Sequence, residues 1–498
     1  MEHGRKSLSR RGFLLGVGGS ALLSACGGGG GGTSSASSSG GTTAPGGTAA
    51  TSPVGMRAPV KIDLSQANLP PGASTVGYAY IIGGLYTNAG LTTFECYRLD
   101  ASGTLHAIST SDNTQAANTF PDPNGVVSAT DRLTINATYP SSWADYSITL
   151  STTAPNYIDL GNINTANIPG LGTGNNAFSM RVYISLGIPK LPFTAQAAYT
   201  AGGVDHVNPY AGPGFDSGSP GALCLFDWFE CSIDSGGVLN GNPTYVDQFG
   251  MPLVVVAQPG TSTQGQLNIT RQQVLTNIAS FSPASVYAGL TQAATASSAY
   301  PSGTNYLRAI SPDHLAGLSG TPGAGASFGT YFDTTISAWD GLGTDISVTD
   351  TNSGTYVSSS FTSTSVGGVV TGTWTFTKSG SPNLVFNDIT SSNIWQCAGS
   401  MASGGTAQQN IGKQLLAAFN RGQMNTPGPL SLSDSSCPNP TTAYYQSTPY
   451  NMWAKRFHNW SSNGLAYGFA YDDVCSQNPS FNTTGAMTSL SITLGTMF

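Results

Sequence analysis

The chain has 498 residues, of which only 8% are charged, and its formal net charge at pH 7 is −7. Globular proteins carry about 25% charged residues. A negative balance on so few ionisable groups argues against nucleic acid or an anionic membrane face as the ligand, and it favours a neutral, hydroxyl-rich partner. The dominance of Gly, Ser, Thr and Asn is typical of an all-β sandwich or barrel with short turns.

The first 26 residues predict an export signal. The stretch SRRGFLL, residues 9–15, places two arginines before an apolar run, as in twin-arginine signals. That run has about a dozen residues, fewer than the roughly 20 that a membrane-spanning helix needs. It ends in Leu-Ser-Ala-Cys, a lipobox pattern in which Cys26 would be lipidated. We expect an exported lipoprotein that meets the membrane only through this anchor; a signal peptide with a chance cysteine is the alternative.

Residues 27–56 predict a flexible linker. They are almost wholly Gly, Ser, Thr, Ala and Pro, and they offer no apolar side chains for a core. As a random coil this segment would extend on the order of 30 Å. It would hold the folded part of the protein away from the membrane.

Strands are predicted by alternating runs such as YAYIIGGLY (78–86), TWTFTKS (373–379) and LSITLGTMF (490–498). Helices are predicted where apolar residues recur at helical spacing, in 270–281, 332–339, 411–422 and 453–460. Thr270 and Gln273 form a capping box at the first of these. The first two helices suggest that a mixed α/β domain, 260–345, interrupts a β domain formed by 57–259 and part of 346–498.

One segment contains three acids, Glu230, Asp234 and Asp247, in a chain that has few charges. Trp228 and Tyr245 are among the aromatic residues beside them, and the flanking runs LCLF and PLVVV predict strands. Paired carboxylates near flat aromatic surfaces are what glycoside hydrolysis requires. The alternative is structural, because acids beside a Gly-Asn turn often bond only to the turn and strand aromatics are usually core.

The cysteines predict an oxidising compartment. There are seven: Cys26, Cys96, Cys224, Cys231, Cys397, Cys437 and Cys475. Lipidation of Cys26 leaves six, enough for three disulfides, with buried thiols as the alternative. Cys224 and Cys231 lie about 23 Å apart on one strand and cannot bridge each other. We expect Cys397 to pair with Cys437. The spacings indicate no metal or redox site, and we expect no cofactor.

The acidic segment resembles the catalytic segment of glycoside hydrolase family 64, bacterial endo-β-1,3-glucanases with a thaumatin-like fold. The family pattern has a Glu two residues before a Thr or Ser and four before an Asx; here these are Glu230, Ser232 and Asp234. A second pattern, Thr-x-Val-Asp-x-Phe-Gly-x-Pro, begins at Thr244 and places its acid at Asp247. Further segments resemble the family in the same order: 180–193, 206–213, 331–339, 415–422 and 450–474.

The resemblance implies a thaumatin-like β domain and a mixed α/β domain with a wide groove between them. It also implies inversion by single displacement, with Glu230 as general acid and Asp247 as general base; Asp234 is the rival base. The two carboxyl groups should then lie about 6.5–9.5 Å apart. Glu230 must carry a proton near neutral pH, and we expect Trp228 and a negative charge such as Asp234 to help it do so.

Further residues are candidates for substrate binding. Ser232 and Thr244 would bind sugar hydroxyls or the attacking water, and Trp228 and Tyr245 would contact the rings. Asp234 is a further candidate for substrate binding. The pair Asp472–Asp473 lies near the groove in the family, although Asp pairs at turns are more often structural.

Two function classes follow from the resemblance. The first is an endo-acting β-1,3-glucan hydrolase that works outside the cytoplasm and releases short laminari-oligosaccharides. The second is a non-catalytic glucan-binding surface lipoprotein on the same fold, since a fold does not imply activity. The presence of both Glu230 and Asp247 favours the hydrolase. We expect a monomer.

Overall fold

The computed structural model describes residues 55–67, 76–116, 142–187, 190–215, 221, 224–260, 262–281, 286–287, 289–293, 306–312, 328–342 and 346–497. The predicted signal, its Cys26 and nearly all of the predicted linker lie outside these residues. No helix in the described ranges combines the length and the apolar character that crossing a membrane would require.

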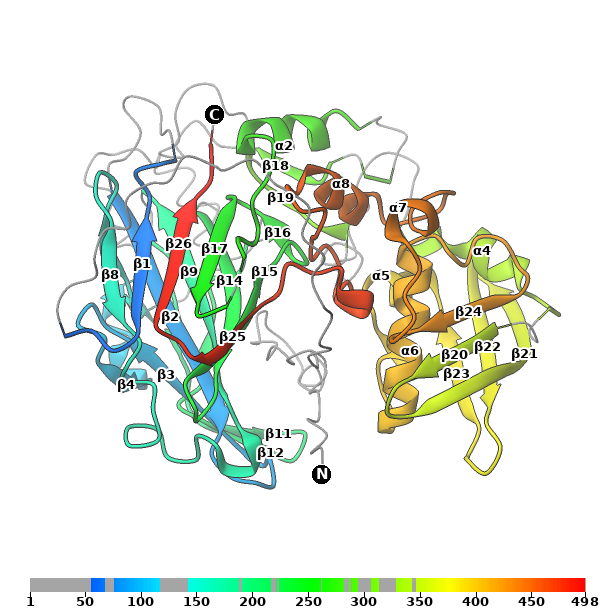
Figure 1. Ribbon diagram of the computed structural model, residues 1–498, viewed down its shortest axis with the longest axis horizontal. Helices are drawn as coiled ribbons and strands as arrows, with labels where there is room; N and C mark the ends of the chain where they lie inside the picture. Colours follow the sequence, from blue (N-terminus) through cyan, green and yellow to red (C-terminus); the bar gives the residue numbers. More distant parts are fainter. Residues whose placement is uncertain are drawn as a thin grey trace.

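A ten-stranded sheet forms the largest layer of the molecule (Figure 1). Its main path is β11 (Tyr199–Ala201), β12 (Val204–Val207), β3 (Thr93–Leu99), β2 (Val76–Tyr86), β9 (Phe178–Leu186), β14 (Leu225–Ile233), β15 (Val238–Pro243) and β25 (Phe481–Ala486), with β4 (Leu105–Ala107) beside β3 and β7 (Ile148–Ser151) beside β2. The path runs from β11 to β25 without closing, so within the described residues this sheet is open and not a barrel.

A four-stranded sheet packs on one face of this layer. It consists of β17 (Leu253–Gln258), β26 (Ser489–Leu494), β1 (Pro59–Asp63) and β8 (Asn156–Asp159). The core between the two sheets contains Ile62, Ile81, Val182, Phe229 and Ile492. Because every second residue of a strand points to the same side, Phe229 faces this core while Glu230 faces the other way. The predicted mainly β fold is therefore present as a sandwich.

The opposite face of the ten-stranded sheet carries an aromatic cluster that includes Tyr80, Tyr183, Phe193, Phe226 and Trp228. Several rings in it are in contact, with Tyr183 and Trp228 at a centroid distance of 5.7 Å. Two-stranded pairs complete this side: β10 (Thr194–Ala195) with β13 (Tyr210–Ala211), and β5 (Gln115–Ala116) with β6 (Ser142–Trp143). This cluster supports the sheet face on which the acids lie.

A second lobe contains a five-stranded sheet covered by helices on one face (Figure 1). The strands are β23 (Leu384–Ile389), β22 (Val369–Thr377), β21 (Gly354–Val366), β20 (Ile346–Asp350) and β24 (Leu430–Ser433). The helices of this lobe are α4 (Asp333–Ala338), α5 (Ser391–Trp395), α6 (Thr406–Asn420) and α7 (Pro440–Ala443). Phe361, Trp374 and Phe386 face Ile411 and Leu415 of α6 in one core, so this α/β lobe extends well beyond residue 345.

A smaller group of elements lies between the two lobes in Figure 1. It comprises a three-stranded sheet, β16 (Gln248–Phe249), β19 (Tyr306–Ile310) and β18 (Thr291–Ala293), with α2 (Arg271–Ala279) and α8 (Met452–Trp460). Short 3-10 helices are η1 (Thr110–Asp112), η2 (Thr173–Asn175), η3 (Phe328–Thr330), η4 (Gly399–Met401) and η5 (Val474–Ser476). The four predicted helical stripes are confirmed, and Thr270 with Gln273 forms the predicted capping box of α2.

The predicted disulfide between Cys397 and Cys437 is wrong. Cys437 bonds to Cys475, with a Cα–Cα distance of 5.6 Å, whereas Cys397 is buried in the α/β core. Cys96 and Cys224 are buried thiols, so the expectation of three disulfides is also wrong. Burial raises the pKa of each thiol to about 12, which keeps them protonated and unreactive.

Candidate active site

Glu230 lies in the middle of the ten-stranded sheet. β14 pairs antiparallel with β9, and this register places Glu230 directly opposite Arg181 and Trp228 directly opposite Tyr183. On its other side β14 pairs with β15, where Asn242 is the residue opposite Glu230. Residues paired in this way share one face of a sheet. Four polar or aromatic side chains therefore lie on the same face around the Glu230 carboxyl group.

Arg181 contacts both of the predicted catalytic acids. Its Nε and Nη2 donate to Glu230 Oε1 at 3.0 and 2.8 Å, and the same Nη2 lies 3.8 Å from Asp247 Oδ2. The two carboxylate oxygens are therefore separated by at most the sum of the Nη2 distances, about 6.6 Å. The Glu230 side chain is 2% exposed and that of Asp247 is 30% exposed. One acid is enclosed and the other is open to water.

The environment of Arg181 favours its charged form. Burial disfavours the guanidinium charge, but the charges of Glu230 and Asp247 raise the pKa of Arg181 above its ordinary value. The guanidinium carbon also lies 5.1 Å from the centre of the Trp228 ring, a cation–π distance. Trp228 itself is only 3% exposed. In this position its ring supports Arg181.

The segment that carries Asp247 is fixed to β14 by Asp227. The Asp227 carboxylate accepts hydrogen bonds from the backbone N–H groups of Gly250 at 2.8 Å and Met251 at 3.0 Å, as well as from Trp228 N. Gly250 passes so close to the Phe226 carbonyl that an added Cβ would lie 2.1 Å from that oxygen. Together these contacts hold the Asp247 segment against the strand that carries Glu230.

Asp227 is an unusual carboxylic acid. It is 2% exposed, and burial raises its pKa to about 7 in spite of its three N–H donors.

The segment that carries Asp247 has a further backbone contact, in which Ser311 N donates to the Asp247 carbonyl at 2.9 Å. The backbone around Asp247 is therefore bonded from two sides.

The remaining candidates in the acidic segment have well-defined structural partners. Asp234 accepts hydrogen bonds from Gly236 N at 2.8 Å and Val238 N at 2.9 Å, so its carboxylate closes the turn between β14 and β15. Tyr245 stacks on the Phe457 ring at 4.3 Å and is 3% exposed. Ser232 and Thr244 are buried, at 7% and 4% exposure. By strand alternation Ser232 shares the face of Glu230.

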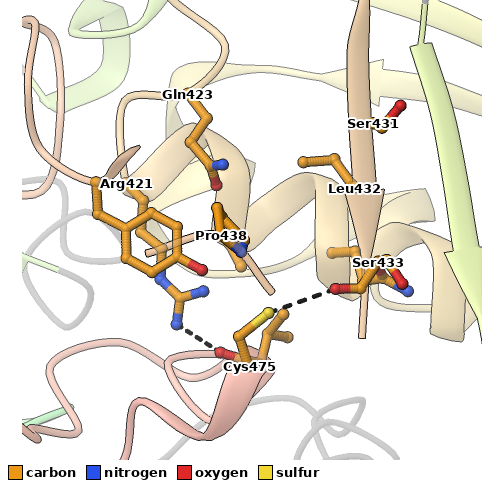
Figure 2. Close-up of a pocket in the computed structure, with 11 residues that line it drawn as sticks. Arg421, Gln423, Ser431, Leu432, Ser433, Pro438 and Cys475 are labelled. Carbon is orange, nitrogen blue, oxygen red and sulfur yellow. Dashed lines mark hydrogen bonds between the residues drawn. The ribbon is translucent and has the colours of Figure 1, made fainter. Parts of the chain in front are cut away.

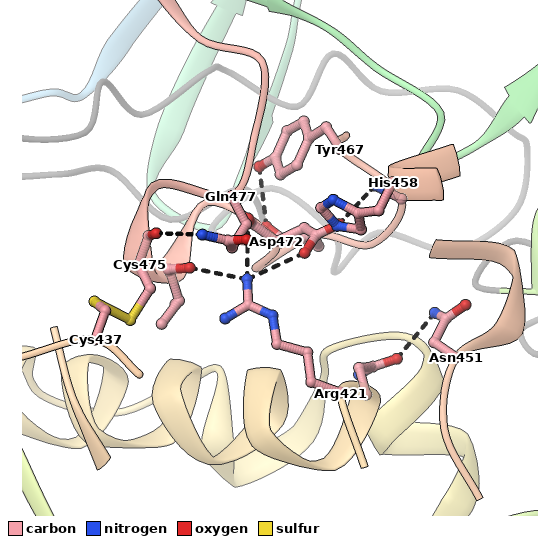
Figure 3. A network of polar contacts seen from close by, with 12 residues as sticks. Arg421, Cys437, Asn451, His458, Tyr467, Asp472, Cys475 and Gln477 are labelled. Carbon is pink, nitrogen blue, oxygen red and sulfur yellow. Dashed lines mark hydrogen bonds and ion pairs between the residues drawn. A yellow bond between two sulfur atoms is a disulfide. The ribbon is translucent and has the colours of Figure 1, made fainter. Parts of the chain in front are cut away.

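Asp472 lies where α6, α8 and the chain leading to β25 meet (Figure 3). Asp472 has no exposed surface, and its carboxylate pairs with Arg421 at 3.1 Å and with His458 Nε2 at 3.0 Å. Asp473, the next residue, is half-buried. Asp472 therefore has the partners of a structural ion pair, and we do not include it in the site proposed below.

A small cavity lies next to this network (Figure 2). It measures about 20 Å³, enough for a single water molecule, and Arg421 and Cys475 are among the residues that line it. None of its lining residues comes from β9, β14 or the Asp247 segment. It cannot hold a sugar ring.

Arg181 and Asp227 belong to the site but are not among the residues predicted from the sequence. Arg181 was visible only as a charged residue within the apolar run MRVYISL, and Asp227 only as a further acid on the predicted strand. A charged side chain in the middle of a buried strand requires a partner. This requirement could have indicated that Arg181 and Asp227 lie next to other polar groups.

Comparison with known families identifies this chain. A family model described as β-1,3-glucanase, glycoside hydrolase family 64, matches residues 78–494, which is most of the chain. The chain belongs to glycoside hydrolase family 64. The match to this family includes β9, β14 and the Asp247 segment, so the acid pair and Arg181 all lie within it.

The chain shares less than a third of its aligned residues with each of three similar proteins. It is 29% identical over 263 residues to a glucan endo-1,3-beta-glucosidase of Cellulosimicrobium cellulans, and the match covers 51% of this chain but only 42% of that protein. A β-1,3-glucanase domain from Clostridium beijerinckii has a similar structure, with a TM-score of 0.60, 21% identity and coverage of 88% and 98% of the two chains. A laminaripentaose-producing β-1,3-glucanase, solved in complex with laminaritetraose, is also similar, with a TM-score of 0.57 and 21% identity. That match covers 89% of this chain and 99% of the other.

Proposed function

We propose that this chain cleaves β-1,3-glucan internally, by single displacement with inversion, and releases short laminari-oligosaccharides. Glu230 is the general acid and Asp247 the general base. The observation that carries the proposal is the contact of one guanidinium with both carboxylates, which shows that the two acids lie close together. Membership of a family described as β-1,3-glucanase supports the substrate.

The mechanism uses the different surroundings of the two acids. Enclosed Glu230 gives its proton to the glycosidic oxygen as the bond from the anomeric carbon to that oxygen breaks. Asp247, 30% exposed, takes a proton from a water molecule whose oxygen attacks the anomeric carbon from the opposite face. Ser232 and Thr244 are proposed to bind the attacking water or sugar hydroxyls. Trp228 acts through Arg181, whose guanidinium it supports.

We further propose that the protein is exported and works outside the cytoplasm as a lipoprotein anchored through Cys26. The twin-arginine pattern and lipobox support this location. The Cys437–Cys475 disulfide also supports it, because disulfides persist in oxidising compartments.

Hydrolysis of linear β-1,3-glucan by the purified protein tests the function. Glu230→Gln and Asp247→Asn should each lower the rate by at least about 100-fold, the usual contribution of a general acid or base, and the α anomer should form first. Asp234→Asn is the matched control, because Asp234 lies in the same segment but closes its own turn; it should retain most of the activity. Binding to insoluble glucan with no hydrolysis by the wild type would instead indicate a glucan-binding protein.

A further inference from the structure

Arg181 occupies a position that a simple acid–base pair does not explain. A general acid must hold a proton, yet Glu230 meets two N–H donors of a cation within 3.0 Å. An arginine partner favours the ionised carboxylate. Asp234, which could have opposed this, is bonded to its own turn. The observed ion pair is therefore the arrangement expected after Glu230 has given its proton away.

In the mechanism proposed above, the negative charge of the acid pair moves from one carboxylate to the other during one turnover. Before the reaction Glu230 is protonated and Asp247 is ionised. Afterwards the Glu230 proton is on the leaving-group oxygen, a proton from water is on Asp247, and Glu230 is ionised. The pair carries one negative charge at both stages, but that charge has moved from one carboxylate to the other. A cation that reaches both acids can neutralise the charge in either place.

The geometry gives Arg181 this reach. Its Nη2 is 2.8 Å from Glu230 Oε1 and 3.8 Å from Asp247 Oδ2, so a displacement of about 1 Å would exchange the shorter contact. The Trp228 ring centre is 5.1 Å from the guanidinium carbon, so a sideways displacement of this size would keep the two groups within cation–π range. Other titratable groups near Arg181 are Tyr183 on β9 and Tyr210 on β13; burial raises the pKa of both, so they stay neutral.

We propose that Arg181 is a positioning residue that exchanges partners in each turnover, pairing with Asp247 while Glu230 holds its proton and with Glu230 once that proton has gone to the leaving group. It does not touch the bond that is broken. Its effect is to keep the ionised acid neutralised at both ends of the reaction. Water then returns the Asp247 proton to solvent, and Glu230 takes up a new one, which resets the pair.

The pH profile of kcat/KM on linear β-1,3-glucan tests the exchange. Removal of the positive charge in Arg181→Met should lower kcat and move both limbs of the profile upward by about 1–3 pH units, because each acid loses a nearby cation. Arg181→Lys keeps the positive charge, so both limbs of its pH profile should lie within about half a pH unit of those of the wild type. Arg98→Met is the matched control: Arg98 lies on β3, two strands from Arg181 on the same face, and pairs with Asp112. The limbs of the Arg98→Met profile should match those of the wild type.

Unshifted limbs in a folded Arg181→Met variant with lowered kcat would overturn the proposal and leave Arg181 a merely structural residue. If that variant does not fold, the crystal structure of Glu230→Gln decides, since the amide imitates the protonated acid. Nη2 of Arg181 should then lie within about 3 Å of Asp247 Oδ2, a normal hydrogen-bond distance. Retention of Arg181 on the side chain at position 230 would overturn the exchange. Absence of hydrolysis by the wild type would instead remove the proposed function itself.

Discussion

At the scale of single residues, Asp227 shows how a buried acid can organise a site without taking part in the reaction. It lies three residues before Glu230 on β14, and its carboxylate bonds to the backbone of the segment that carries Asp247. One strand thus determines the positions of both acids. Burial raises the pKa of Asp227 to about 7, so its ionisation changes near neutral pH.

This pKa predicts how the stability of the fold changes with pH. An acid whose pKa is raised by folding binds its proton more tightly in the folded state, so its contribution is complete below about pH 4 and is lost as the pH rises towards 7. Asp227→Asn cannot titrate. Between pH 4 and pH 8 the wild-type free energy of unfolding should therefore fall relative to that of the variant, by on the order of 4 kcal/mol. Denaturant titrations of both proteins measure this, and parallel curves would contradict it.

The acid pair could be predicted from the sequence because its residue types and spacing resemble a family motif. Its electrostatic partner could not. Arg181 is 49 residues from Glu230 in the chain, and only the pairing of β9 with β14 brings them together. The expected neighbour, Asp234, is close in sequence but forms the turn after β14. The spacing of residues along the chain therefore predicted the two acids. It did not predict the pairing of β9 with β14, which places Arg181 beside Glu230.

At the scale of secondary-structure elements, α6, α8 and the chain leading to β25 are joined by one buried ion-pair network (Figure 3). Arg421 follows the end of α6, His458 lies in the last turn of α8, and Asp472 lies between them. The Cys437–Cys475 disulfide closes the same junction. The four helices were predictable because each shows a clear apolar stripe. This junction was not, because the chain around Cys475 is irregular and Cys475 itself has φ of 61°.

Removal of one charge from this network should be costly. Asp472→Asn leaves Arg421 buried without its carboxylate, and we expect a loss of about 3–5 kcal/mol in the free energy of unfolding. Asp100 and His106 provide a matched exposed pair, 2.8 Å apart with side chains 36% and 41% exposed. Asp100→Asn should therefore cost about 1 kcal/mol or less. Equal losses in the two variants, measured by urea denaturation, would show that burial of the Asp472 pair adds nothing.

The same network predicts a pH range of greatest stability. The pKa of His458 is raised because, although burial opposes its charge, Asp472 favours it, so the His458 contribution is lost as pH rises through that value. Burial also opposes the charge of Asp472, but His458 and Arg421 lower its pKa, so the Asp472 contribution is lost as pH falls. Both contributions are complete between about pH 4 and pH 6.5, the ordinary pKa values of the two groups.

At the scale of the whole molecule, the sandwich is completed by strands from opposite ends of the chain. β26 lies between β17 and β1 and pairs in parallel with β1, as Ile62↔Ile492 shows. Ile492 is 1% exposed in the core between the sheets. Ile492→Ala should therefore cost about 2–5 kcal/mol. Ser491→Ala, on the opposite side of the same strand, should cost less than about 0.5 kcal/mol. Thermal unfolding of the two variants compares them.

The position of β26 delays the completion of the sandwich during synthesis. Val60 pairs with Leu490, and about 430 residues separate them in the chain. At about 5–20 residues per second, a ribosome delivers the second strand roughly 20 to 90 s after the first. Throughout that interval the edge of β1 that β26 will cover is open to other chains. The nascent protein therefore has a long period in which a chaperone would protect it, and it can complete its sandwich only after β26 has been made.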